Sequence, residues 1–305
     1  MADSAHTITV AEPVGRAWRV PRWVVLTLRF GRRKPLGAIG AVLILALLVM
    51  AAFAERIAPY AYDQSVARTK PPSAQFWMGT DNLGRDVWSR VVYGARISVT
   101  VGFATVALAT LLAIVIGVSS AYVGGAYDML LQRVVDAWIS FPALVIILSL
   151  LAALGPGLLN LIFALSIILA AGTSRVIRGA TLSVMQNPYV EAARAVGAGH
   201  ARILLLYVLP NIMATIIILA TIGLGTVILA ESALSFLGFG VPPPYPSWGG
   251  MLSGSGRTFM YHAPWMALFP GAAISLAVFG FNMLGDGLRD VLDPRLRGGS
   301  GRAGG

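Results

Sequence analysis

Residues 97–123 read ISVTVGFATVALATLLAIVIGVSSAYV and contain no Asp, Glu, Lys or Arg. A helix needs about 20 apolar residues to cross the hydrocarbon core of a bilayer, where every backbone N–H and C=O must be bonded within the chain. This stretch is long enough to cross with some tilt. It therefore predicts a transmembrane helix.

Further runs of the same kind lie on both sides of this stretch. Together with it, the predicted spans are 36–53, 97–123, 134–154, 158–173, 209–230 and 264–285. The third contains only Asp136 near its start, and Gly155, Pro156 and Gly157 separate it from the fourth, because Pro and Gly interrupt helices. The predicted fold class is an all-α integral membrane protein with six transmembrane helices.

The composition agrees with a membrane protein. Of 305 residues, 57% are hydrophobic and 12% are charged, against about 25% charged in soluble domains. This disfavours a water-soluble enzyme, a disordered chain and a fibrous chain. The absence of cysteine excludes disulfides, thiol chemistry and Cys-ligated metals. Residues 1–35 do not read as a cleaved signal peptide, because a long basic arm precedes an apolar run of full span length.

The net charge of +10 is distributed unequally between the two sides of the membrane. With the N-terminus inside, 16 Lys and Arg lie inside and 7 outside, and six of those seven fall in one long loop, where the positive-inside rule is weak. We therefore expect both termini in the cytoplasm and no nucleic-acid partner. The basic residues of 16–34 are expected to lie against anionic lipid headgroups, with binding to a protein partner as the alternative.

The chain is then predicted to divide by membrane side. The expected parts are a cytoplasmic basic arm at 1–35, a first transmembrane helix at 36–54, an external loop at 55–96 with an interfacial helix over 86–96, a transmembrane domain at 97–286 with a cytoplasmic loop at 174–208 and an external loop at 231–262, and a cytoplasmic tail at 287–305.

The first external loop contains the sequence GTDNLGRD at 79–86. It predicts a turn followed by a helix cap, since Asp and Asn accept from free N–H groups at helix starts. A calcium loop is not indicated, because the alternating ligands and the terminal Glu are missing. The second external loop, with prolines at 242–244 and 246 and then Trp248, reads either as a hairpin covering the bundle or as a contact to an external partner or to the translocation path.

The loop at 174–208 has the most informative chemistry. A turn at Asn187, a short helix over 191–196, a break at Gly197 and a second helix over 201–207 are expected. The helix carries the small residues Ala192, Ala193 and Ala195, so it could lie close in a groove of another protein, and Arg194 and Arg202 could bond to carboxylates there. The alternative is an interfacial helix whose arginines touch lipid phosphates.

At these residues the chain resembles the inner-membrane permeases of ABC importers. Their cytoplasmic signature is Glu-Ala-Ala, three residues, Gly, nine residues, then Ile-x-Leu-Pro, and it is matched by Glu191, Ala192, Ala193, Gly197, Leu209 and Pro210, with Tyr207 at the Ile position. The stretches at 79–90, 233–238, 247–249, 282–290 and 292–295 resemble the C-type subunit of the dipeptide/oligopeptide/nickel branch. The resemblance covers about 36–296.

The resemblance implies a type I permease core of five helices plus one N-terminal helix, in a bacterial inner membrane. It implies a homologous second permease, two cytoplasmic ABC ATPase subunits that carry ATP and Mg²⁺, and an external substrate-binding protein, with no cofactor in this chain. The implied ATPase-coupling residues are Glu191, Ala192, Ala193, Arg194, Gly197, Arg202 and Pro210, and the implied outer-loop motif residues are Gly79, Thr80, Asp81, Gly84, Arg85 and Asp86. Short peptides are the expected cargo, with nickel chelates, glutathione-like peptides or oligosaccharides as alternatives.

Other energy sources and functions find less support. The two lysines, Lys34 and Lys70, do not follow Gly, so the chain has no phosphate-binding loop for ATP hydrolysis. A secondary transporter usually places ionisable groups at mid-membrane, whereas Asp136, Glu231 and Asp286 lie at span ends. Catalysis is disfavoured because the three histidines are dispersed and no HExxH or GxSxG motif occurs. A membrane scaffold without transport is the other alternative.

A substrate path would be lined by residues on the spans. Uncharged polar groups on the spans are candidates, but the sequence does not orient them: Thr105, Ser149, Asn160, Ser166, Thr215, Thr221 and Asn282.

Overall fold

The computed structural model describes residues 34–253, 255–259 and 261–292, and the described chain is helical with no named strand. Most of the basic arm (1–33) and most of the tail (293–305), including the motif at 292–295 beyond its first residue, lie outside the described residues.

Five helical segments are long and apolar enough to cross a membrane. They are α2 (Pro35–Ala52), α4 (Val87–Val123), α7 (Leu158–Met185), the continuous helix His200–Phe236 and α13 (Trp265–Leu292). A sixth span results if the bent pair α5 (Gly125–Ile139) and α6 (Ala143–Leu154) crosses as one. The predicted all-α membrane fold is confirmed.

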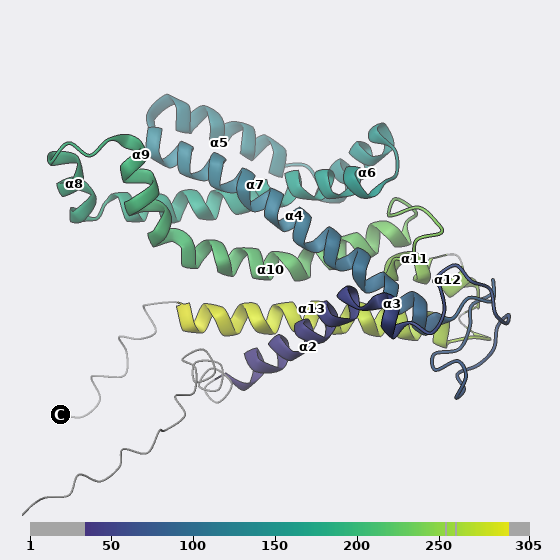
Figure 1. Ribbon diagram of the computed structural model, residues 1–305. Coiled ribbons are helices and arrows are strands. Elements are labelled where there is room, and N and C mark those ends of the chain that lie inside the picture. The colour runs from purple at the N-terminus through teal and green to yellow at the C-terminus, as the bar shows by residue number, and fades with distance from the viewer. Residues whose placement is uncertain (1–33, 254, 260, 293–305) are drawn as a thin grey trace, which may run out of the picture.

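Shorter elements lie at the two ends of the bundle (Figure 1). At one end are α8 (Pro188–Ala195) and the start of the long helix, made of α9 (His200–Arg202) and a π-helical turn at Ile203–Val208, before α10 (Leu209–Phe236). At the other end are α3 (Ala54–Ile57), α11 (Trp248–Leu252) and α12 (Ser255–Phe259). The predicted loops at 174–208 and 231–262 therefore lie at opposite ends of the bundle.

The third predicted span, 134–154, is not one straight helix. The α5 and α6 axes meet at 87°, with the break at residues 140–142. Proline disfavours the α conformation in the residue before it and cannot donate a backbone hydrogen bond, so the helix ends ahead of Pro142. The Ser140 Oγ donates to the Asp136 carbonyl (2.7 Å), which satisfies one of the last free acceptors of α5.

The expected interfacial helix at 86–96 is not a separate element. Asp86 is the N-cap of α4, and the helix continues without a break from Val87 through the predicted span to Val123. Similarly, α7 continues past the predicted end of the fourth span at 173 to Met185. The inner loop is therefore much shorter than 174–208.

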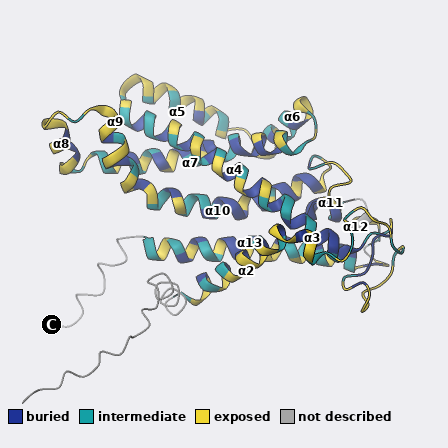
Figure 2. Ribbon diagram, in the orientation of Figure 1, coloured by how far each residue is buried: buried dark blue, intermediate teal, exposed yellow. Residues whose placement is uncertain are grey.

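Small residues set the distances between the long helices. A Cβ on Gly117 of α4 would lie 2.5 Å from the Ser174 carbonyl oxygen of α7, and a Cβ on Gly40 of α2 would lie 2.6 Å from the Gly280 carbonyl oxygen of α13. Backbones can approach this closely only where no side chain intervenes, which is how helices pack in lipid. The outward faces of α2 and α5 are exposed (Figure 2) and carry apolar side chains such as Val42 and Leu130.

Candidate functional site

The short helix α8 begins at Pro188 with Asn187 as its N-cap, three residues before the predicted start at 191. Proline is favoured in the first turn of a helix because its missing N–H would be unpaired there in any case. The Asn187 Nδ2 donates back to the carbonyls of Ser183 (3.1 Å) and Val184 (3.0 Å). These bonds fix the corner between α7 and α8.

Two side chains anchor α8 to the bundle. Val190 and Ala193, three residues apart on one face, are 0% and 5% exposed, and Val190 belongs to a cluster with Ile177, Ile203 and Val208. The cluster joins α8 to the end of α7 and the start of the long helix that contains α10. Motion of α8 would therefore be transmitted to both helices.

The opposite face of α8 is exposed to solvent in this chain. Glu191, Ala192, Arg194 and Ala195 are exposed, and Val196 at the end of the helix is 85% exposed. Within the described chain, Glu191 forms no ion pair. A short helix with a buried anchor, a bare alanine and an unpaired carboxylate is suited to docking on another protein.

Gly197 ends α8 in a Schellman motif. Its φ is +81°, its N–H donates to the Arg194 carbonyl (3.0 Å), and the Ala198 N–H donates to the Ala193 carbonyl (3.0 Å). A Cβ on Gly197 would meet nothing within 4 Å. The backbone conformation, and not a lack of space, is therefore what requires glycine at this turn.

Three further residues of the implied ATPase-coupling set are Arg194, Arg202 and Pro210. The Arg194 guanidinium lies 6.0 Å from the centroid of the Tyr122 ring, and the Tyr122 hydroxyl lies 2.6 Å from His200 Nδ1. Arg202 is exposed at the end of α9, and Pro210 follows the π-helical turn. Proline offers no N–H to the carbonyl four residues earlier, which favours a local change of hydrogen-bond register.

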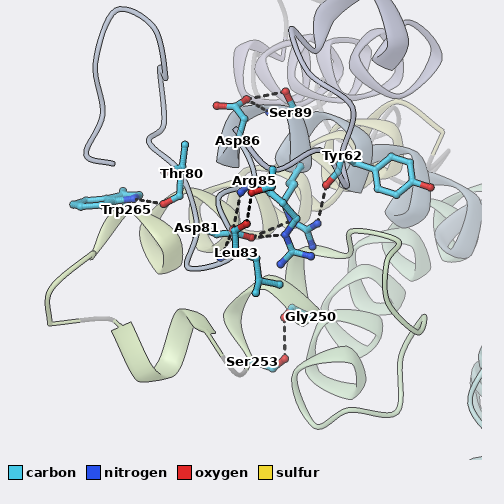
Figure 3. A network of polar contacts seen from close by, with 12 residues as sticks. Tyr62, Thr80, Asp81, Leu83, Arg85, Asp86, Ser89, Gly250, Ser253 and Trp265 are labelled. Carbon is cyan, nitrogen blue, oxygen red and sulfur yellow. Dashed lines mark hydrogen bonds and ion pairs between the residues drawn. The ribbon is translucent and has the colours of Figure 1, made fainter. Parts of the chain in front are cut away.

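The outer-loop motif forms a buried network at the other end (Figure 3). Asp81 is 5% exposed; its Oδ1 accepts from the backbone N–H groups of Leu83 (2.9 Å) and Arg85 (2.8 Å), and its Oδ2 accepts from Arg85 Nε (2.7 Å). Arg90 lies 3.9 Å from the same carboxylate and donates to the Tyr62 carbonyl (2.9 Å). The motif thus closes its own turn and ties it to α4.

Neighbouring motif residues attach the loop to the bundle. The Trp265 Nε1 donates to the Thr80 carbonyl (3.1 Å), and a Cβ on Gly79 would lie 2.7 Å from that nitrogen. The backbones of Gly79 and Gly84 have φ of +72° and +83°. Trp265 was not a candidate from sequence, because it lies 185 residues from Thr80 and only the fold brings the two together.

The predicted cap is present at Asp86. Its Oδ2 accepts from the Ser89 N–H (2.8 Å) and the Ser89 hydroxyl (2.7 Å) at the start of α4. Nearby, Trp248 of the second external loop is 1% exposed and donates from Nε1 to the Val91 carbonyl (2.9 Å). This part of the second loop is packed on the bundle, whereas Tyr245 and Tyr261 are exposed.

Two ion pairs between α5 and α7 were not expected. The Arg178 Nε donates to Asp128 Oδ1 (2.7 Å), and Arg175 pairs with Asp136. They border an open polar cavity of about 460 Å³. The acids lie eight residues apart on one helix and the arginines three apart on another, but only the packing of α5 on α7 pairs them. Among the described residues, no group of three His, Asp or Glu could hold a metal ion.

The described chain is thus an apolar helical bundle with candidate membrane spans, an exposed short helix at one end and a hydrogen-bonded loop at the other, which is the form of a multi-pass membrane protein. The family model for the binding-protein-dependent transport system inner membrane component matches residues 109–298, and the N-terminal transmembrane domain of oligopeptide transport permease C matches residues 23–76. The chain belongs to this family of transport permeases.

Several relatives are similar over most of their length. The dipeptide transport system permease DppC of Alkalihalophilus pseudofirmus is 41% identical over 87% of this chain and 88% of its own. A putative peptide transport system permease of Brucella suis is 41% identical over 90% and 93%, and the glutathione transport system permease GsiD of Escherichia coli is 39% identical over 88% and 89%. A solved inward-facing form of the MetNI methionine ABC transporter has the same fold, with a TM-score of 0.55 and 18% identity, covering 67% of this chain and 96% of that chain.

Proposed function

We propose that this chain is one of two homologous permease subunits of an ATP-driven importer for short peptides in a bacterial inner membrane. An external binding protein delivers the cargo, and two cytoplasmic ATPases that carry ATP and Mg²⁺ supply the energy. Both termini face the cytoplasm, on the same side as α8. The peptide assignment is supported by the relatives, which are named for dipeptide, peptide and glutathione transport.

The geometry of α8 is the observation that carries this proposal. Val190 joins α8 to the membrane helices through a buried cluster and Ala193 is buried beside it, while Glu191 and Ala192 are exposed and Arg194 is exposed with its guanidinium near the Tyr122 ring. A helix that passes motion from a soluble ATPase to membrane helices needs a buried contact to those helices and an exposed face for the ATPase. Arg194 and Arg202 are placed to bond to carboxylates of the ATPase, and Glu191 to cap or pair with its donors.

In the proposed mechanism α8 moves as one rigid unit with the helices it contacts, and the complex alternates between two states. ATP closes the ATPase dimer, and the groove that holds α8 moves with it. Because α8 shares a buried cluster with α7 and the long helix, the shift passes to both helices and the bundle opens outward to accept cargo. Hydrolysis then returns the complex to its first state.

The experiment replaces a small residue on the exposed face of α8. Ala192→Trp adds bulk where nothing in this chain is displaced, so the chain should fold, while ATPase binding and ATP-driven dipeptide uptake should be lost. Ala126→Trp is the matched control, because Ala126 is exposed on α5 at the same end of the bundle. Normal ATPase co-purification and uptake by the Ala192→Trp variant would refute the proposal.

A further inference from the structure

A groove of about 710 Å³ lies between α7, α10 and α13 at the end of the bundle that carries α8. One end of it lies at a close contact between α10 and α13: Ile222 lines the groove, and a Cβ on Gly285 of α13 would lie 2.9 Å from Ile222 Cγ1. Its volume is in the range of ligand pockets, which runs from about 300 to 1,000 Å³.

One face of α10 forms the floor. Asn211, Thr215, Ile218 and Ile222 line the groove at a spacing of four, three and four residues, so they form one helical stripe. The side of α10 that packs on α4 is a different one, since Leu224 faces Gly102 across that contact. The groove is therefore on the part of α10 turned away from α4.

The walls add a few polar groups to an apolar surface. Val176, Ala180 and Ser183 form a second stripe on α7, and Arg289 with Leu292 closes the groove from α13. The lining is thus mainly aliphatic, with hydroxyl and amide groups that can bond to a peptide backbone. The Asn211 amide donates to the Tyr207 carbonyl (2.6 Å), which leaves its own oxygen free to accept.

Arg289 is the only charged side chain among the described residues that line the groove. The neighbouring Asp290 is paired with Lys34 (2.6 Å), and within the described chain Arg289 has no ion-pair partner. A guanidinium favours planar carboxylates, which it binds through two parallel hydrogen bonds. A short peptide carries one such group at its C-terminus.

We propose that this groove is the chain's half of the cytoplasmic exit for cargo, and that Arg289 binds the C-terminal carboxylate of the departing peptide. The inference rests on the proposed function. A single exposed cation holds a carboxylate weakly, and this suits an exit, because a passing ligand must bind well enough to enter and weakly enough to leave. Thr215, which the sequence could not orient, is assigned to the path.

The first test uses the absence of cysteine from the chain. In inside-out vesicles holding the assembled importer, Thr215→Cys should react with a membrane-impermeant maleimide, because an exit that opens to the cytoplasm admits water. Met213→Cys is the matched control, since Met213 is at the same depth but outside the groove and 39% exposed on another face. Equal reaction rates at the two positions would overturn the assignment of the groove, whether or not peptides are imported.

The second test concerns the carboxylate. In proteoliposomes with the complete importer, Arg289→Gln should lower uptake of an alanine tripeptide about threefold, which is the loss expected for one exposed ion pair. Uptake of the C-terminal amide of the same peptide should be unchanged. Arg289→Lys should retain part of the preference, and Arg133→Gln on α5 should retain all of it. An equal loss for both peptides would mean that Arg289 binds lipid phosphate or an ATPase, and would refute the carboxylate role. If wild type imports neither peptide, the proposed function itself fails.

Discussion

Gly197 shows how a single residue determines the end of α8, the helix that we propose docks on the ATPase. Its φ of +81° is accessible to glycine but costs other residues roughly 1 kcal/mol or more, while the space around it is open. We expect Gly197→Ala to weaken ATPase co-purification and uptake, and Gly197→Asn to do so less, because Asn tolerates this conformation.

Gly199 supplies the control for this prediction. It lies two residues further on, has a φ of −67° and is equally free of neighbours, so Gly199→Ala should behave like wild type. If the two alanine variants behaved alike, the Schellman turn would not be the reason that position 197 holds glycine.

Asp81 is a second position where one side chain decides local stability. It is 5% exposed beside Arg85 and Arg90, and removing one member of a buried charge pair costs about 3 kcal/mol. Asp81→Ala should therefore lower the unfolding temperature in detergent and expose the outer loop to protease. Glu55→Ala should change the temperature little, because Glu55 pairs with Arg96 while 72% exposed and such pairs are worth less than about 1 kcal/mol.

At the scale of elements, the crossing of α4 and α7 depends on Gly117. A methyl group there would lie 2.5 Å from the Ser174 carbonyl oxygen and 3.0 Å from the Arg178 nitrogen, both backbone atoms that cannot rotate away. Gly117→Ala should destabilise the purified chain by about 1–3 kcal/mol, seen as a lower unfolding temperature. Gly172→Ala on α7, which meets nothing within 4 Å, should be neutral or slightly stabilising. A neutral Gly117→Ala would show that the helices can separate without cost.

At the scale of the whole molecule, the excess of Lys and Arg on one side of the predicted spans indicates one orientation in the membrane. Val196 and Tyr261 are 85% and 87% exposed at opposite ends of the bundle. In intact spheroplasts an impermeant maleimide should label Tyr261→Cys and leave Val196→Cys unlabelled until the cytoplasmic side is opened. The reverse pattern would invert the orientation and place α8 outside, where no ATPase could reach it.

Much of this architecture could be predicted from the sequence because bilayer physics leaves few choices. An uncharged run such as 97–123 has to be helical where no water is present, and a basic excess has to lie on one side. A short helix over 191–196 that ends at Gly197 was predicted from local rules for helix formers and glycine, and the structure has it at 188–195, because proline is also favoured in a first helical turn. These features depend on residues close in sequence.

What the sequence by itself determined, then, was the helical class, the number of apolar runs and the presence of a short helix that carries the Glu-Ala-Ala signature. The tertiary structure decided which faces meet: the pairing of Asp128 with Arg178, the bond from Trp265 to Thr80 and the groove that Thr215 lines. A span that is apolar around its whole circumference carries no periodic signal for which side faces a neighbour. Orientation and pairing are therefore set by close packing between distant segments, and not by local pattern.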